Sequence, residues 1–413
     1  MIASRSAIND IQSWVIARGL AGGSETDVLH GFCARCRDAG LPLSHGLVII
    51  DTLHPTYEGR AFRWHVTPTN ESSTIEYGPT KEGEAAEKWR QSPFHHLLQT
   101  GTDEYRWQIA RSGTESFGTI QSLRDKGHTD YIALIHRFDK DGSIGEMDAV
   151  YSHWTTDADD GFDDEDLDVL RELVPSVALA IKCISLNRVA ATLVDVYLGH
   201  QTGQRVLQGQ MTRGVAERIH AALWFSDLRD FTTISEQIAP EEIIPMLNDY
   251  AEIVISSIQE RGGEVLKLMG DGVLAIFTAT SIGAACKAAL SAEESVRIRS
   301  KELSASRTAD GKPTTSVYLG LHVGDVFYGN IGSDERLDFT VIGPAVNEVG
   351  RIAAMCRSCG QLTLASTEFN TASRSADRSR LVSVGRYALR GVERPQELFT
   401  IDRFRERAPK RTH

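Results

Sequence analysis

The sequence has few cysteines, no long apolar run and no surplus of positive charge. Six cysteines in 413 residues are too few for the disulfide framework of a small secreted protein. No apolar run approaches the roughly 20 residues that cross a bilayer, and the polar segment Met1–Asp10 lacks the apolar core of a signal peptide. The net charge of −12 argues against a basic surface for nucleic acid. We therefore expect a cytoplasmic globular protein that binds neither nucleic acid nor membranes.

Two Cys-x-x-Cys pairs stand out among these cysteines, Cys33 with Cys36 and Cys356 with Cys359. This spacing occurs in zinc sites and in redox-active dithiols. Both pairs fall in segments of helical pattern, and neither has obvious ligand partners nearby in the sequence. We therefore expect reduced thiols without a metal or a redox role.

The length of the chain predicts two or three domains, because a single core rarely grows to 413 residues. Residues 1–162 hold several strand-like runs and five of the six tryptophans, and we expect them to form one domain. Residues 163–215 are predicted to be a connector helix followed by a glycine-containing joint. Residues 216–403 form a second expected domain, and residues 404–413 a tail.

The predicted connector helix carries an apolar seam. Apolar residues recur at intervals of three and four, which places them on one face of a helix: Leu167, Leu170, Val174, Val177, Ile181 and Ile184. From Leu186 the spacing continues in a shifted phase, and Pro175 should bend the helix. Two interpretations stay open, a parallel dimeric connector or a helix packed on its own N-terminal domain.

From about residue 216 onward, strand patterns alternate with helix and hairpin patterns. The helices are clearest at 241–260 and 280–299, and Asp271-Gly272 is a strong hairpin-turn signal between apolar strands. This order predicts an α+β domain whose sheet carries helices on one face.

Two aspartates in this domain lie at the ends of strand-like runs, Asp227 after Ala221–Ser226 and Asp271 in the predicted hairpin turn. Mg²⁺ prefers oxygen ligands and is usually shared between one or two protein carboxylates and substrate phosphates. A helix is predicted to begin over Leu228–Thr233, and the backbone N–H groups at a helix start favour phosphate oxygens. The pattern indicates nucleotide chemistry.

Further polar residues lie where they can contact a nucleotide. Lys267 precedes Asp271 by four residues on the same hairpin. A helix is predicted to begin near Pro344, and Asn347 and Arg351 fall four residues apart on one face of it. An amide and a guanidinium on one face can grip a ribose and a phosphate together. Each of these residues taken alone is also compatible with an ordinary solvated side chain.

The domain resembles the class III nucleotidyl cyclases through four motifs in order: Phe225–Thr232, Leu266–Gly272, Leu319–Gly324 and Thr340–Arg351. The resemblance covers about residues 216–403. It implies a ferredoxin-like, palm-type α+β catalytic domain that forms a 3′,5′-cyclic nucleotide and pyrophosphate.

The resemblance assigns the metal ligands and the turn that follows them. Two Mg²⁺ ions per site, or Mn²⁺ in their place, would be held by Asp227, Asp271 and the carbonyl of Leu228. The substrate-binding turn would comprise Arg229, Phe231 and Thr232. Asp230 departs from the family, which often has glycine there, and adds a negative charge beside the expected phosphates.

The resemblance also assigns the remaining contacts. Lys267 and Thr340 match the positions that read the base, and this combination is typical of adenylate-selective bacterial members, whereas guanylate-selective members typically have glutamate and cysteine. Asn347 and Arg351 match the residues that orient the ribose and stabilise the transition state. The implied enzyme is an adenylate cyclase that acts on ATP. It would be a homodimer in which each site takes the acid pair from one subunit and the other four residues from its partner.

The N-terminal domain bears a fainter resemblance, in Trp154–Leu173, to the end of a GAF domain. The resemblance implies an α/β sensor domain that regulates the catalytic domain by binding an unknown small-molecule effector. Candidate pocket residues are His54, Trp64, His65, Tyr105 and Trp107. Two other functions stay open for the chain, a guanylate cyclase and a catalytically silent nucleotide-binding regulator.

Overall fold

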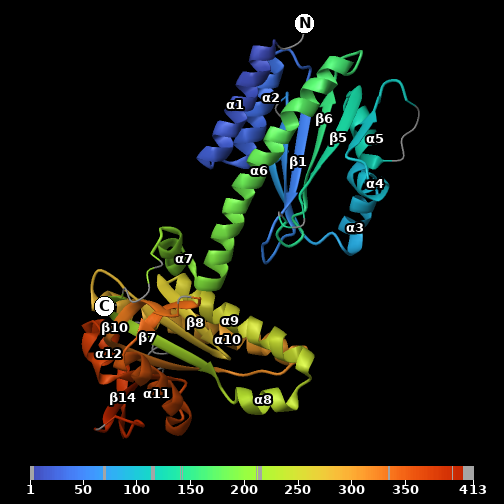
Figure 1. Cartoon of the computed structure of the whole chain (residues 1–413). Coiled ribbons are helices and arrows are strands. Elements are labelled where there is room, and N and C mark those ends of the chain that lie inside the picture. Colours follow the sequence, from blue (N-terminus) through green and yellow to red (C-terminus); the bar gives the residue numbers. More distant parts are fainter. Residues whose placement is uncertain are drawn as a thin grey trace, which may run out of the picture. The chain divides into compact units, whose positions relative to one another are not determined.

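The computed structural model describes residues 4–67, 71–112, 117–139, 141, 143–210, 212, 216–333, 335–392 and 394–402. The chain divides into two compact units, Met1–Leu193 and Val194–His413 (Figure 1). Helix α6 (Asp164–Leu198) belongs mostly to the first unit, and its last residues belong to the second.

The first unit is built on a six-stranded antiparallel sheet in the order β3-β2-β1-β6-β5-β4. Its strands are β1 (His45–Asp51), β2 (Gly59–His65), β3 (Thr74–Tyr77), β4 (Glu104–Trp107), β5 (Asp130–Arg137) and β6 (Ala149–Thr156). Every residue of β6 is buried, and so are the first six of β5. Because side chains alternate between the two faces of a strand, both faces of this sheet must be covered.

Helices supply that cover on both faces. They are α1 (Arg5–Ala21), α2 (Glu25–Asp38), α3 (Gly83–Arg90), α4 (Pro93–Thr100), α5 (Gly118–Asp125) and α6. On one face α1, α2 and α6 share a core with the sheet in which Phe32 packs edge-on against Trp154 (Figure 1). On the other face, α4 and α5 pack around Tyr131 and Tyr151.

The apolar seam of α6 packs inside the first unit. Its six residues from Leu167 to Ile184 are at most 5% exposed and belong to the core shared with α1, α2 and the sheet. The interpretation of a helix packed on its own domain therefore holds for this half of the seam. Further along, Leu193 and Val196 are 37% and 51% exposed. Pro175 lies inside one continuous helix.

Helix α6 is also long and apolar enough, by length and composition alone, to cross a membrane. Its most apolar 18-residue window has a mean hydropathy of 1.6. The expectation that no apolar segment approaches the length of a membrane span therefore does not hold for this helix. Core helices of soluble proteins pass the same test, and 39% of the window is buried. The finding is weak evidence for a membrane span.

The second unit contains an eight-stranded sheet in the order β13-β14-β12-β10-β7-β9-β8, with β11 paired to β10. The strands are β7 (Ala216–Leu228), β8 (Gly263–Met269), β9 (Gly272–Phe277), β10 (Val317–Gly332), β11 (Leu337–Ile342), β12 (Thr363–Ser366), β13 (Leu381–Tyr387) and β14 (Gln396–Ile401). The long antiparallel pair of β7 and β10 forms its centre, and β12 joins β10 in parallel.

Helices cover both faces of this sheet, which corrects the expectation of one covered face. They are α7 (His200–Leu207), α8 (Phe231–Gln237), α9 (Pro240–Gln259), α10 (Ile282–Ala309), α11 (Pro344–Cys359), α12 (Thr367–Ala372) and α13 (Ser375–Arg378). Trp224 shares a core with α9, α10 and α12, whereas its neighbour Leu223 shares another with Val349 of α11. The signal was in the sequence, because Ala221–Phe225 is an unbroken apolar run rather than an alternating one.

The turn between β8 and β9 lies one residue earlier than predicted. Met269 pairs with Gly272, so Gly270 and Asp271 form the turn. Gly270 has a φ of 66°, a left-handed conformation that glycine adopts without strain. Asp271 therefore sits at the tip of a tight hairpin, where two strands fix its backbone.

Candidate active site

Asp227 and Asp271 come together at one edge of the second unit. Asp227 is the last residue but one of β7, and Asp271 lies in the turn that leads into β9, the neighbour of β7 in the sheet. The backbone N–H of Leu228 donates to both carboxylates, at 3.1 Å to Oδ1 of Asp227 and 3.3 Å to Oδ2 of Asp271. One backbone donor thus holds two carboxylates side by side.

This acid pair lacks a counter-charge from the protein. Burial, followed by the hydrogen bond and charge of Asp271, raises the pKa of Asp227 to about 7, and no described cationic side chain opposes the rise. Asp227 therefore holds a proton for part of the time near neutral pH unless a cation replaces it. The pair lines a cavity of about 170 Å³. Carboxylate oxygens of this kind fit a hard divalent cation.

The turn after β7 contains an aspartate in an unusual conformation. Asp230 has a φ of 57°, and among the other described residues only glycines have a positive φ. Helix α8 begins directly after it, at Phe231. Glycine adopts this conformation at lower cost. Arg229, at 3.2 Å, and Arg357 of α11 both pair with the Asp230 carboxylate, so protein cations offset its charge. Thr232 is exposed in the first turn of α8.

Lys267 and Thr340 lie near one another at the edge formed by β8 and β11. Lys267 forms an ion pair with Asp338 of β11, in which the two side chains are 42% and 48% exposed. Thr340 follows Asp338 by two residues and therefore lies on the same face of β11. The structure thus adds a carboxylate to the two residues predicted to read a base.

Asn347 and Arg351 lie one turn apart on α11, which has Pro344 in its first turn as predicted. Both line a cavity of about 820 Å³. The Arg351 guanidinium rests against Gly391, where an added Cβ would come within 3.3 Å of Nη2. An added Cβ at Gly350 would meet nothing within 4 Å, so packing within the chain does not require glycine there.

The acid pair and the pair on α11 lie in two separate cavities of one chain, and the other predicted contact residues line neither of them: Lys267, Thr340, Arg229, Phe231 and Thr232. The acid pair lines the first and the pair on α11 lines the second, and no described residue lines both. Exposed large apolar side chains lie at both cavities, two at the first and one at the second. Ile244 and Leu268 at the first are 61% and 56% exposed, and Ile342 at the second is 50% exposed. Exposed apolar side chains gathered at a site are typical of surfaces that a partner covers.

Both Cys-x-x-Cys pairs lie in helices, in α2 and α11, as the sequence predicts. Cys33, Cys36 and Cys356 are buried. Burial raises the pKa of the Cys356 thiol to about 12 and holds that of Cys36 well above its ordinary range. Thiols that stay protonated are poor nucleophiles and poor metal ligands, so these residues pack as small apolar side chains.

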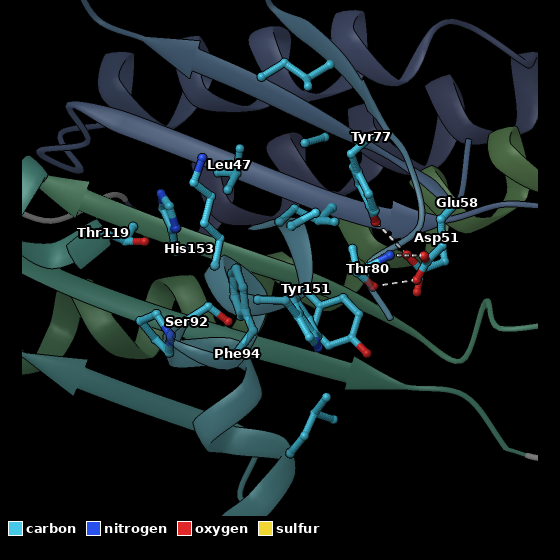
Figure 2. A pocket seen from close by; sticks show the side chains of 18 of the residues that line it. Leu47, Asp51, Glu58, Tyr77, Thr80, Ser92, Phe94, Thr119, Tyr151 and His153 are labelled. Atoms are coloured by element: carbon cyan, nitrogen blue, oxygen red, sulfur yellow. Dashed lines mark hydrogen bonds between the residues drawn. The ribbon is translucent and has the colours of Figure 1, made fainter. Parts of the chain in front are cut away.

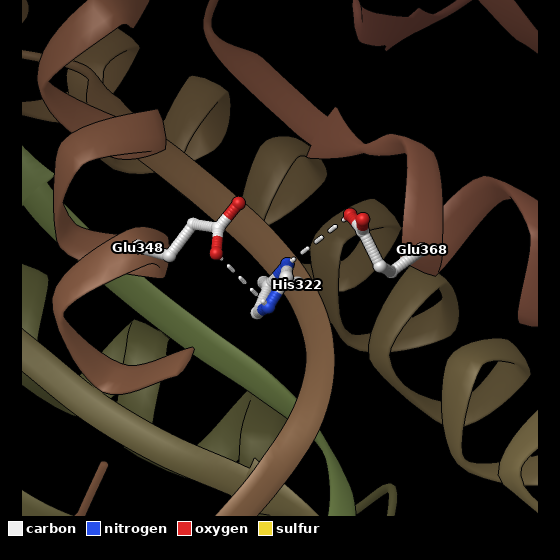
Figure 3. Close-up of side chains that lie close together, drawn as sticks. All are labelled: His322, Glu348 and Glu368. Carbon is white, nitrogen blue, oxygen red and sulfur yellow. Dashed lines mark ion pairs between the residues drawn. The ribbon is translucent and has the colours of Figure 1, made fainter. Parts of the chain in front are cut away.

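A second cluster of ligand-type residues comprises His322 of β10, Glu348 of α11 and Glu368 of α12 (Figure 3). Each residue offers one ligand atom within 4.8 Å of the others. The carboxylates approach different ring nitrogens, Glu348 at 3.8 Å from Nε2 and Glu368 at 3.7 Å from Nδ1. Nδ1 also lies 2.9 Å from the hydroxyl of Ser366. Because the two carboxylates approach different nitrogens of the ring, the three side chains are better placed to contact one another than to bind one shared metal ion.

Sequence reasoning missed three residues around the predicted site, Asp338, Arg357 and Gly391. The sequence could have indicated Asp338, because it stands two positions before Thr340 and side chains at this spacing lie on the same face of a strand. Arg357 gave no signal, since its contact with Asp230 joins α11 to the turn after β7. Gly391 meets Arg351 only through the tertiary fold.

Comparisons with known proteins agree on the second unit. Residues 216–402 match the family model described as the adenylate and guanylate cyclase catalytic domain. The chain is 35% identical over 147 residues to an adenylate cyclase of Anabaena cylindrica, and 33% identical over 156 residues to adenylate cyclase 1 of Rhizobium meliloti (strain 1021). These alignments cover 36% and 37% of this chain but only 29% and 23% of the relatives, so the chain spans less than a third of their length.

Among solved structures, the chain is similar to the adenylyl cyclase CyaB from P. aeruginosa. The two are 26% identical, with a TM-score of 0.41, and the match covers 45% of this chain and 95% of that one.

We predict that millimolar Mg²⁺ raises the Tm of the second unit, and more so at high pH. The folded pKa of Asp227 lies above the ordinary value of an aspartate. The bound proton therefore stabilises the metal-free fold at low pH, and this contribution is lost as the pH rises through about 7. Because Mg²⁺ takes the place of the proton, its Tm shift in differential scanning fluorimetry should be larger at about pH 8 than at about pH 6.

Asp271→Asn should remove most of this Mg²⁺ shift. Asp310→Asn is the matched control, because it changes an exposed carboxylate at the end of α10. Equal Mg²⁺ shifts in both variants, or a shift that does not depend on pH, would contradict a cation at the acid pair.

Proposed function

We propose that the second unit, whose residues 216–402 are a catalytic domain of the adenylate and guanylate cyclase family, converts ATP into 3′,5′-cyclic AMP and pyrophosphate. The observation that carries the proposal is the acid pair, in which two carboxylates share one N–H and no described cation offsets them. The similarity to two proteins named as adenylate cyclases supports ATP as the substrate.

The acid pair would hold two Mg²⁺ ions, or Mn²⁺ in their place, against the triphosphate. Asp227 and Asp271 supply carboxylate oxygens, and the carbonyl of Leu228 supplies a neutral one. When bound, such ions favour ionisation of the ribose 3′-hydroxyl and neutralise phosphate charge. The contribution of the protein is rigidity, because a strand end and a two-residue turn hold the carboxylates in place.

Lys267 and Thr340 would read the base. The ammonium donates a hydrogen bond to a ring nitrogen of adenine, and the threonine hydroxyl accepts one from the amino group. Asp338 orients the ammonium through its ion pair with Lys267. Guanine presents a carbonyl where adenine presents its amino group, so the two residues together favour ATP.

Asn347 and Arg351 would hold the ribose and the phosphates. The reaction is an in-line attack of the ribose 3′-oxygen on the α-phosphorus, with pyrophosphate as the leaving group. Arg351 would meet the charge that grows on the α-phosphoryl oxygens, and one such donor contributes about 3 kcal/mol. Nucleophile and electrophile belong to one molecule, so positioning supplies much of the remaining acceleration.

We infer that a complete site forms between two copies of the chain. The acid pair and the pair on α11 line different cavities, and exposed apolar side chains lie at both, Ile244 and Leu268 at the first and Ile342 at the second. In a symmetric dimer, the acid pair of one subunit faces the base-reading and ribose-holding residues of the other, and the symmetry produces two equivalent sites. A monomer would then be inactive.

GTP is the second candidate substrate, and one observation favours it. Asp338 places a carboxylate beside Thr340, and a carboxylate can accept hydrogen bonds from N1–H and the amino group of guanine. Lys267 already occupies this carboxylate in the structure, and for that reason we place ATP first. A catalytically silent regulator has no comparable observation in its favour.

We further propose that the first unit regulates the second as a GAF-like sensor. The faint resemblance of Trp154–Leu173 to a GAF domain supports this role, and so does a cavity of about 770 Å³ within the unit. The sign of regulation would be read from the rate of cyclic nucleotide formation with and without a bound effector.

The purified full-length protein should convert ATP to cyclic AMP in the presence of Mg²⁺ or Mn²⁺, as measured by chromatography of the nucleotides. Asp271→Ala should lower the turnover at least about a hundredfold, because it removes a metal ligand. Asp310→Ala changes an exposed carboxylate that does not line the cavity of the acid pair, and it should retain the turnover of the unmodified protein. Similar turnover in both variants would overturn the role of the acid pair.

The double change of Lys267→Glu and Thr340→Cys should shift substrate preference towards GTP. We expect the ratio of kcat/KM for ATP to that for GTP to fall at least about tenfold, since the polar groups that pair with adenine are lost. Steady-state kinetics with both nucleotides measures this ratio. If the unmodified enzyme already prefers GTP, the assignment of the base-reading residues is wrong.

A further inference from the structure

The first unit contains a cavity of about 770 Å³ that the proposed catalytic site does not use (Figure 2). Residues of β1, β2, β3, β5 and β6 line it, together with residues of α3, α4 and α5. Its volume falls in the range of small-molecule sites, about 300 to 1,000 Å³. The cavity is not lined by the residues first considered for a pocket, which were His54, Trp64, His65, Tyr105 and Trp107.

Apolar and aromatic side chains make up most of the wall. The aromatic residues are Tyr77, Trp89, Phe94, Tyr131 and Tyr151. The larger aliphatic ones are Leu47, Ile49, Ile75 and Leu98. Rings contributed by both the sheet and the helices favour a flat apolar ligand, and the faces of such rings also attract cations.

One end of the cavity is acidic. The carboxylates that line it are Asp51, Glu58, Glu146 and Asp148. The hydroxyl of Tyr77 donates to Asp51 at 2.5 Å, and that of Thr80 donates to Glu58 at 2.7 Å (Figure 2). Burial raises the pKa of Asp51 to about 6, and the other three carboxylates add to the rise. Negative charge is therefore crowded at this end.

The basic residues in the wall already have acidic partners. The ion pairs are Arg63 with Glu71, Lys81 with Glu146, and Lys88 with Glu84. By contrast, Asp51, Glu58 and Asp148 form no ion pair with any basic residue that the structure describes. The cavity thus offers unneutralised carboxylates to a cation and no spare cation to an anion.

The opposite end of the cavity presents neutral polar groups. His153 and Tyr131 are 3% and 0% exposed, and within the described part of the chain the His153 Nδ1 and the Tyr131 hydroxyl have no hydrogen-bond partner. Figure 2 shows His153 and Asp51 at opposite ends of the pocket. Burial lowers the pKa of His153 to about 3, so its ring is uncharged at neutral pH. An unpaired buried polar group costs free energy that a ligand can recover.

We propose that this cavity binds an organic amine, with a flat ring among the aromatic residues and a protonated nitrogen among Asp51, Glu58 and Asp148. The ammonium compensates carboxylates that form no ion pair with a described basic residue, and its N–H groups make charge-assisted hydrogen bonds to them. A small polar group at the far end of the ring would approach His153. The proposal goes beyond the catalytic function and does not depend on it.

The test compares three matched probes on the full-length protein, phenethylamine, 2-phenylethanol and phenylacetate, which share a ring and differ in charge. Binding is read from tryptophan fluorescence, to which Trp89 in the cavity wall contributes, and from thermal stabilisation. The amine should bind at least about tenfold more tightly than the alcohol, and the carboxylate should bind most weakly. Equal affinities, tightest binding of the carboxylate, or no binding of the amine overturns the proposal.

Two variants locate the ammonium. Asp51→Asn removes the charge but keeps an acceptor for Tyr77, and it should weaken amine binding roughly ten- to hundredfold while sparing the alcohol. Glu87→Gln is the matched control, because this exposed carboxylate of α3 lies outside the wall and is not the partner of any basic residue in the wall, so its loss should leave amine binding unchanged. If circular dichroism shows that Asp51→Asn does not fold, Glu58→Gln takes its place with the same expected loss.

A folded acid-end variant that binds the amine as tightly as the control overturns the assignment of the ammonium to this end. These measurements do not involve cyclic nucleotide formation. Failure of the amine proposal and failure of the catalytic proposal are therefore distinguishable.

Discussion

Two carboxylates held by one backbone N–H are the constraint on which the second unit depends. The pairing of β7 with β9 and the tight turn before β9 bring Asp227 and Asp271 to the N–H of Leu228. Burial, and then the hydrogen bond and the like charge of Asp271, raise the pKa of Asp227 to about 7. Such a perturbed pair is expected where a bound cation, with the phosphates that it carries, completes a functional site.

The residues predicted to form one catalytic site do not meet in a single cavity of one chain. The acid pair and the pair on α11 line different cavities, and exposed apolar side chains lie at both, Ile244 and Leu268 at the first and Ile342 at the second, where a second copy of the chain could cover them. The first unit also holds carboxylates without a basic partner, since Asp51, Glu58 and Asp148 form no ion pair with any described basic residue. In both units, carboxylates without a basic partner indicate that the ligand brings a positive charge.

Local sequence patterns predicted the features that depend on neighbours in the chain. The strand before Asp227, the hairpin near Asp271 and the start of α11 at Pro344 all lie close to their expected positions. Most of the features that were missed depend on tertiary contacts. The ion pairs of Asp338 with Lys267 and of Arg357 with Asp230 each join distant segments. The helices on both faces of the sheet were missed for another reason, because the unbroken apolar run Ala221–Phe225 signalled them in the sequence. The roles of the site residues and the amine cavity stay predictions.

The central claim is that a working site takes residues from two copies of the chain, and mixing two inactive variants tests it most directly. Asp271→Asn lacks a metal ligand, Arg351→Ala lacks the guanidinium, and each alone should be inactive. In an equal mixture about half of the dimers carry both variants and hold one intact site, so the account predicts recovery of about a quarter of the unmodified turnover. Mixed dimers that are demonstrated by native mass spectrometry and still form no cyclic nucleotide would contradict it.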